Sequence, residues 1–289
     1  MLMNRPVVVG LDGSPSSLVA AEHAARAAVQ RSAPLHLVHG YLHPLGYGVP
    51  LNPYDVGIPA PSESAQEMLT RTATELAGRW PGLELEVRQV AGGPGATLVE
   101  ESRRADLVVV GSRGLGGFAG LLLGSVGTQV SAHAHCPVLV VRPTEEPVPL
   151  DGPVLVGVDG SESADLAVGY AADEAARRAA TLVLAHVRDP DASGPEGGPK
   201  AGAGGDVLLD AAAAALRAAH PDLVVEERVL RSARPEQALV EASGDAALVV
   251  VGSRGRGGFT GLLLGSVSQA LVQHARCPVL VARPHGHEA

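Results

Sequence analysis

The residues best suited to chemistry in this sequence are two copies of a glycine-rich segment. Gly111-Ser112-Arg113-Gly114 is followed, after nine residues, by Gly124-Ser125-Val126, and the pattern returns 141 residues later from Gly252 to Val267. Each copy follows an apolar run typical of a buried strand and precedes a segment typical of a helix. Glycines at such a junction let backbone N–H groups approach a ligand, and a helix N-terminus carries partial positive charge. The repeat therefore predicts a phosphate-binding site in each copy.

Two familiar phosphate-binding motifs do not fit this segment. A Walker A loop needs a lysine directly after its second glycine, and neither copy has one. The first copy fits the dinucleotide fingerprint from Gly114 to Ala119, but the second has Thr260 in the last place. The fingerprint also expects an acidic residue about 20 positions on, at the end of a strand, where this chain has Arg142. An NAD site is therefore disfavoured.

An Asp-Gly-Ser segment ends the first apolar run of each half. VVVGLDGS at residues 7–14 returns as VLVGVDGS at residues 154–161. Two interpretations of Asp12 and Asp159 are open. Each carboxylate stabilises an Asp-Gly turn, or each binds a ligand at the carboxyl end of the first strand, where open α/β sheets bind ligands.

Serine and arginine side chains of the repeat also have two interpretations. Ser125 and Ser266 are predicted N-caps of the helices that follow, and Ser266 with Gln269 fits a capping box. The same hydroxyls are placed to contact a phosphate. Arg113 and Arg254 either make a charge-assisted contact with a phosphate or face water.

The histidine and cysteine residues that follow each copy of the glycine-rich segment argue against a metal site. The segment His133-Ala134-His135-Cys136 becomes His274-Ala275-Arg276-Cys277, so one ligand is lost while its surroundings are kept. Each cysteine is instead expected to be a buried, reduced thiol. His39 and His186, which end the second predicted strands, are expected to be structural.

Composition and charge limit the classes of function. The 289 residues are 46% hydrophobic and 18% charged, with only two Phe, four Tyr and one Trp, so a soluble protein with a core of Val, Leu and Ala is expected. The scarcity of aromatic rings disfavours a stacking platform for single-stranded nucleic acid. A net charge of -9 argues against nucleic acid and anionic membranes as partners. Without a leader-like or membrane-spanning apolar run, a cytoplasmic location is expected.

Internal repetition predicts two tandem domains, 1–146 and 147–289. From Gly111 to Pro143 the two copies match at 23 of 33 positions. The proline- and acid-rich segment 143–153 cannot continue a strand or a helix, so it is expected to link the domains.

Alternating patterns predict an α/β fold in each domain. Strands are expected near 6–11, 35–39, 84–90, 106–111 and 137–142, with helices near 15–32, 63–79, 94–104 and 126–134. The second domain repeats the order, with strands near 153–158, 181–187, 223–230, 246–252 and 278–282. Near-continuous apolar strands between helices predict a doubly wound, Rossmann-like parallel sheet of five strands. Segments 41–61 and 191–205 are expected to be loops at its carboxyl edge, which either cover a ligand or are unconstrained insertions.

The Gly-x2-Gly-x9-Gly-Ser spacing and the Val-Gly-Leu/Val-Asp-Gly-Ser segment resemble the universal stress protein family of the ATP-binding kind. The resemblance covers essentially the whole chain, as two tandem domains. It implies a strand order of 3-2-1-4-5 and one ATP, with or without Mg²⁺, at the switch point of each sheet. It also implies that Asp12 and Asp159 hold the adenine–ribose end of the nucleotide, and that Gly40 and Val187 offer main-chain groups to adenine.

The glycine loops and the helix starts after them are then expected to hold the ribose and the phosphates. The predicted ligand-binding residues of the first domain are Gly10, Asp12, Gly40, Gly111, Ser112, Arg113, Gly114, Leu115, Gly116, Gly117, Gly124, Ser125 and Val126. Those of the second domain are Gly157, Asp159, Val187, Gly252, Ser253, Arg254, Gly255, Arg256, Gly257, Gly258, Gly265, Ser266, Val267 and Ser268.

The resemblance implies a nucleotide-dependent stress-response regulator rather than an enzyme. No catalytic residue is predicted, because the chain near the loops offers no paired carboxylates, no base for a water and no lysine to stabilise a developing phosphate charge. The alternatives are a slow ATPase or nucleotidyl-transfer enzyme on the same sheet, and a scaffold whose loops bind nothing. In the resembled family the fifth strands mediate pairing, so the two halves of the chain are expected to dock against each other pseudo-symmetrically. A further homodimer of the tandem chain is also expected, and the sequence identifies no other protein partner.

Overall fold

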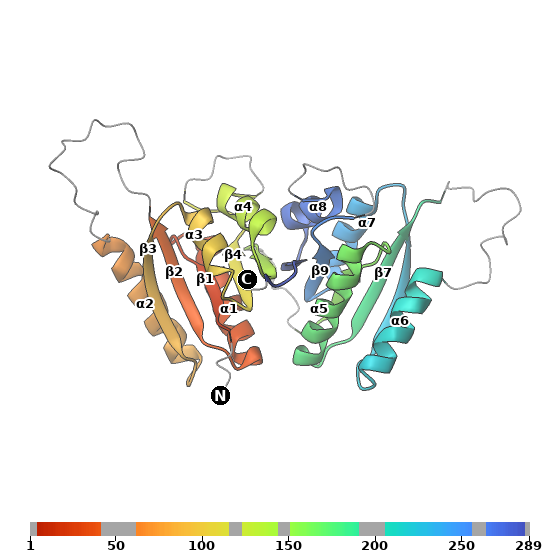
Figure 1. Cartoon of the computed structure of the whole chain (residues 1–289), viewed down its shortest axis with the longest axis horizontal. Helices are drawn as coiled ribbons and strands as arrows, with labels where there is room; N and C mark the ends of the chain where they lie inside the picture. The colour runs from red at the N-terminus through yellow and green to blue at the C-terminus, as the bar shows by residue number, and fades with distance from the viewer. Residues whose placement is uncertain are drawn as a thin grey trace, which may run out of the picture. The chain divides into compact units, whose positions relative to one another are not determined.

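The structure is a computed structural model that describes residues 5–41, 62–115, 123–143, 151–190, 206–255 and 264–286 (Figure 1). The chain divides into two compact units. The first is Met1–Pro143 together with His285–Ala289, and the second is Thr144–Pro284. His285 and Gly286 belong to the first unit, where the Gly286 N–H donates to the His135 carbonyl at 2.8 Å.

The first unit is a five-stranded parallel sheet in the order β3-β2-β1-β4-β5. Helices α1 and α2 pack on each other, as do α3 and α4, and the two pairs cover opposite faces because the strand order reverses at β1. The elements are β1 (Val7–Gly10), α1 (Pro15–Arg31), β2 (Leu35–Tyr41), α2 (Glu63–Arg79), β3 (Leu85–Ala91), α3 (Pro94–Glu101), β4 (Leu107–Gly111), α4 (Ser125–His133) and β5 (Val138–Val141).

The second unit repeats this topology in the order β8-β7-β6-β9-β10, again with parallel strands. Its elements are β6 (Val154–Gly157), α5 (Glu162–Arg178), β7 (Leu182–Arg188), α6 (Val207–Ala219), β8 (Val225–Arg231), α7 (Pro235–Ala242), the 3₁₀ turn η2 (Ser243–Asp245), β9 (Leu248–Gly252), α8 (Ser266–His274) and β10 (Val279–Ala282). The predicted fold class and strand order are confirmed in both units.

Local chemistry explains where the first helix of each unit begins. Ser14 is the N-cap of α1, and its hydroxyl accepts the Ser17 N–H at 3.2 Å, with Pro15 in the first turn. Ser161 caps α5 in the same way through the Ala164 N–H. The buried faces of both helices are largely alanine, so their backbones approach the Val-rich strands closely. No helix of the described residues is long and apolar enough to cross a bilayer.

Candidate functional site

The Asp-Gly-Ser turn and the glycine loop of each unit meet at one edge of the sheet. β1 pairs in parallel with β4, so the residues that follow Gly10 and Gly111 lie side by side. β6 and β9 bring the second copies together in the same way. The strand order reverses at β1 and at β6, and this switch point is where an open parallel sheet leaves a crevice at its carboxyl end.

Asp12 connects the turn with the glycine loop. Its Oδ1 accepts the Ser14 N–H at 2.9 Å, while its Oδ2 accepts the Leu115 N–H at 3.0 Å. Asp159 Oδ1 accepts both the N–H and the hydroxyl of Ser161, at 3.0 and 2.6 Å. The intervening Gly13 and Gly160 have φ values of +82° and +75°, which favour glycine. The turn interpretation of both aspartates is therefore confirmed, and in the first unit the same carboxylate also fixes the loop.

The environment of Asp12 favours its ionised form. Burial alone would raise the pKa of this carboxyl group, but hydrogen bonds from Ser14, Leu115 and Ser17 outweigh burial and hold the pKa below its ordinary value of 3.8. An ionised carboxylate accepts hydrogen bonds and repels phosphate, so Asp12 is suited to the hydroxyl groups of a ligand rather than to its phosphates.

The lowered pKa of Asp12 predicts a pH-dependent contribution to stability. Because the folded pKa is below the unfolded one, ionised Asp12 stabilises the fold fully above pH 3.8, and this contribution is lost as the pH falls through the lower folded pKa. At about pH 6 the wild type is therefore expected to be more stable than Asp12→Asn, and the difference is expected to shrink as the pH approaches about 2. Urea unfolding of both proteins, followed by the fluorescence of Trp80, the one tryptophan, measures this difference in the stability of the first unit. A pH-independent difference would contradict the assignment.

Glycine is required at positions 114 and 255 because a carboxylate oxygen lies directly against each of these residues. A β-carbon on Gly114 would lie 2.5 Å from Asp12 Oδ2, and one on Gly255 would lie 2.6 Å from Asp159 Oδ2. Since real β-carbons do not approach an oxygen so closely, any larger residue must displace the carboxylate. The loop backbone is therefore held directly against Asp12 and Asp159.

Gly111 and Gly252 have a packing role. A β-carbon at Gly111 would lie 2.7 Å from the backbone carbon of Ser16, and one at Gly252 would lie 2.6 Å from the carbonyl oxygen of Ser163. These glycines let the first helix of each unit lie against the end of the fourth strand. Ser112 is fully buried beside Ser16, so its side chain faces α1 and only its backbone can face a ligand.

The predicted caps of α4 and α8 are wrong by one residue. Gly124 and Gly265 occupy the N-cap positions and Ser125 and Ser266 are the first helical residues, so neither serine makes a capping hydrogen bond. The capping box of Ser266 with Gln269 is wrong for the same reason. A glycine cap has no side chain to satisfy the N–H groups of the first helical turn, and such groups are typical anion ligands.

A cavity of ≈ 590 Å³ lies at this edge of the second unit. Small-molecule sites typically have volumes of about 300–1,000 Å³. The predicted residues that line it are Gly157, Asp159, Val187, Gly252, Arg254, Gly255, Gly265, Ser266, Val267 and Ser268. The cavity also has an apolar wall that includes Pro235 and Leu239 of α7, and this wall was not predicted from the sequence. The strand order could have indicated this wall, because it places the helix that follows the third strand against the end of the first strand.

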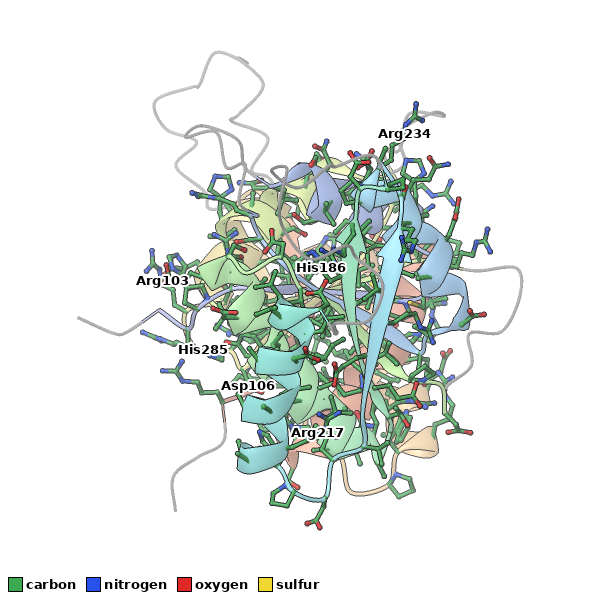
Figure 2. All side chains as sticks on the ribbon, turned by 90° about the vertical axis from the view of Figure 1, so that its right-hand side faces the viewer. Arg103, Asp106, His186, Arg217, Arg234 and His285 are labelled. Carbon is green, nitrogen blue, oxygen red and sulfur yellow. The ribbon has the colours of Figure 1, made fainter. Side chains whose placement is uncertain are left out.

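A histidine of the second strand in each unit contacts the carbonyl group of the residue that follows the first strand. His39 Nδ1 lies 2.6 Å from the Leu11 carbonyl, and His186 Nδ1 lies 2.6 Å from the Val158 carbonyl. A carbonyl can only accept, so Nδ1 carries the proton in both rings. The expected structural role is thus observed. His186, which is labelled in Figure 2, is also one of the residues that line the cavity.

Arginines give the first loop a positive environment. Arg113 and Arg254 are both exposed. The pKa of Arg142, which follows β5, is lowered by burial and then by the positive charge of Arg113, so the two guanidinium groups are near each other. This arrangement is compatible with a phosphate contact by Arg113.

Both cysteines lie in the interior of their units. Neither Cys136 nor Cys277 forms a disulfide bond, and their exposed fractions are 0% and 3%, which confirms the expected buried thiols. Burial raises the pKa of Cys277 to about 12, so this thiol is unreactive near neutral pH. Within the described ranges, no group of three or more His, Cys, Asp and Glu residues could hold a metal ion.

Some predicted site residues lie outside the described residues. These are Gly116, Gly117, Arg256, Gly257 and Gly258, together with segments 42–61 and 191–205.

Comparison with known proteins places the whole chain beside one family. The family model described as universal stress protein family matches residues 3–142 and 152–283. A universal stress protein of Mycobacterium tuberculosis is 39% identical over 290 residues, which cover 96% of each chain. Another from Mycolicibacterium smegmatis is 37% identical over 286 residues, with 96% of this chain and 97% of that one covered. The crystal structure of a universal stress protein from Archaeoglobus fulgidus has the same fold, at a TM-score of 0.74 and 23% identity over 99% of this chain and 100% of that one.

Proposed function

Because the chain belongs to the universal stress protein family as a tandem two-domain member, we propose that it binds one ATP in each domain and acts as a nucleotide-dependent regulator of a stress response. The observation that carries this proposal is the cavity of the second unit. Its lining joins Asp159, the glycine loop and the start of α8 at the switch point of the sheet. Its volume of ≈ 590 Å³ suits a mononucleotide.

The lining of the cavity offers a partner for each part of the nucleotide. Val187, Pro235 and Leu239 form an apolar wall for the adenine ring. The Asp159 carboxylate suits the ribose hydroxyls, and the backbone of the loop and of the first turn of α8 suits the phosphates. Mg²⁺ would accompany the phosphates, since this cation usually keeps several waters and needs few protein ligands.

The first unit supports the same assignment through its own geometry. Asp12 Oδ2 holds the Leu115 N–H, and Gly124 begins α4 without a side-chain cap. A β-carbon at Gly114 would lie as close to the Asp12 carboxylate as one at Gly255 would lie to the Asp159 carboxylate. The two equivalent arrangements of Asp-Gly turn, glycine loop and helix start in one chain are the basis for proposing two nucleotides per chain.

We propose binding rather than turnover because the carboxylates at the two crevices already accept hydrogen bonds from their own turns. A carboxylate held in this way is poorly placed to activate a water. The test is to load the protein with ATP, remove the excess, denature it and identify the released nucleotide. Intact ATP is expected; ADP or AMP that accumulates over several turnovers would contradict the proposal and favour a slow ATPase or a nucleotidyl transferase.

Assembly and location are part of the same proposal. The fifth strands β5 and β10 are short and wholly apolar, and in the family that the sequence resembles these strands mediate pairing. We propose a homodimer located in the cytoplasm. Analytical ultracentrifugation of the full chain with and without ATP measures the oligomeric state.

A further inference from the structure

One hydroxyl distinguishes the loop of the second unit from that of the first. Ser268, in the first turn of α8, is 2% exposed. Its Oγ lies 3.1 Å from the Ser253 carbonyl and 3.2 Å from the Gly265 carbonyl, so its single hydrogen is shared between the start of the loop and the cap of the helix. Gly127 occupies the corresponding position of the first unit.

The backbone connection between loop and helix is the same in the two units, and in the first unit the Gly124 carbonyl also accepts the hydroxyl of Thr128 at 3.0 Å. The Gly124 N–H donates to the Ser112 carbonyl at 2.8 Å, and the Gly265 N–H donates to the Ser253 carbonyl at 2.9 Å. Ser268 therefore adds a second donor to the Ser253 carbonyl. In the first unit the extra connection runs elsewhere, from the Ser14 hydroxyl to the Arg113 carbonyl at 3.3 Å, and so joins the loop to the Asp-Gly turn.

These connections act on different parts of a bound nucleotide. The turn faces the ribose end of the crevice, whereas the loop and the first turn of the helix are the segments whose N–H groups suit phosphates. A hydrogen bond that fixes their separation before binding lowers the entropy lost when both segments must contact one ligand.

We propose that Ser268 is a positioning residue that fixes the phosphate-binding segments of the second domain, so that the two sites differ in how strongly they hold a nucleotide's phosphates. This inference rests on the proposed function. It concerns the ratio of ATP affinity to adenosine affinity at each site, because adenosine carries the base and the ribose without the phosphates.

The test uses the full chain with one site blocked by Gly114→Val or Gly255→Val, and isothermal titration calorimetry with ATP and with adenosine. With the first site blocked, Ser268→Ala is expected to lower the ATP affinity of the second site roughly tenfold, the worth of one hydrogen bond, and to leave adenosine affinity unchanged. Unchanged adenosine affinity also shows that the variant remains folded.

The reciprocal variant tests the same hydroxyl in the first unit. A β-carbon at Gly127 would lie 2.9 Å from the Leu123 Cδ1 methyl group and at an ordinary contact distance of 3.6 Å from the Gly111 carbonyl oxygen, so serine is accommodated when that methyl group moves. With the second site blocked, Gly127→Ser is expected to raise ATP affinity relative to adenosine, and Gly127→Ala is not. Both results are required, and an unchanged ratio in either variant would overturn the inference while leaving the proposed function intact. If neither single-site protein binds ATP or adenosine, both the inference and the proposed function are contradicted.

Discussion

Replacing Gly114 and Gly255 together by valine is expected to weaken nucleotide binding strongly at both sites while both domains remain folded. The new β-carbon would lie within 2.6 Å of a carboxylate oxygen in each unit, so Asp12 and Asp159 must move. In the first unit that movement breaks the hydrogen bond from the Leu115 N–H and changes the shape of the loop. Hydrogen bonds to a charged group are worth about 1.5–3 kcal/mol, so the loss at each site is expected to be on the order of 100-fold.

The fold is expected to survive because both glycines lie on the exposed part of the loop, away from the core. Gly78→Ala and Gly169→Ala provide a matched control, since a β-carbon at either position meets nothing within 4 Å. Fluorescent-ATP binding and thermal unfolding should be measured on both double variants. Full affinity in the valine double variant would show that the loops do not bind the nucleotide.

Gly111→Ala is expected to destabilise the first domain by about 3 kcal/mol, the upper end of the usual cost of overpacking a tight contact. The added β-carbon would lie 2.7–2.8 Å from the backbone of Ser16, which cannot move without shifting α1. Trp80 reports this change selectively, because the one tryptophan of the chain donates through Nε1 to Glu22 of α1 at 3.2 Å. The measurement is urea unfolding followed by Trp80 fluorescence.

Gly78→Ala is the comparison for that experiment in the same domain. Gly78 is an exposed residue of α2 with open space around it, so alanine is expected to stabilise the helix by about 0.5–1 kcal/mol. The two glycine-to-alanine changes thus have opposite expected signs. Equal effects would mean that Gly111 is not held against α1 as the structure describes.

The fold was predictable because its main determinants are local and repeated. Runs such as Val7-Val8-Val9 are buried on both faces, and only a parallel sheet covered by helices explains such strands. The predicted strands and helices agree with the observed ones to within a few residues. The duplication supported these predictions, because the order of strands and helices expected in one domain is repeated in the other.

The site was predictable only in part, because its finer features depend on contacts between distant segments. The glycine spacing indicated a loop for phosphate, but not that Gly114 packs against the Asp12 carboxylate. A serine after a glycine resembles an N-cap, yet the helix begins one residue earlier because the Gly124 carbonyl already accepts the Thr128 N–H. The wall formed by Leu239 and the hydroxyl of Ser268 become visible only when α7, α8 and β9 are packed together.

The stoichiometry of ATP binding shows whether each domain holds one adenine nucleotide. Calorimetric titration of the nucleotide-free full chain is expected to give two ATP per wild-type chain. The single variants Gly114→Val and Gly255→Val are each expected to give one, at the site that was left intact. A wild-type stoichiometry of one or zero, or two retained sites in either single variant, would contradict the account.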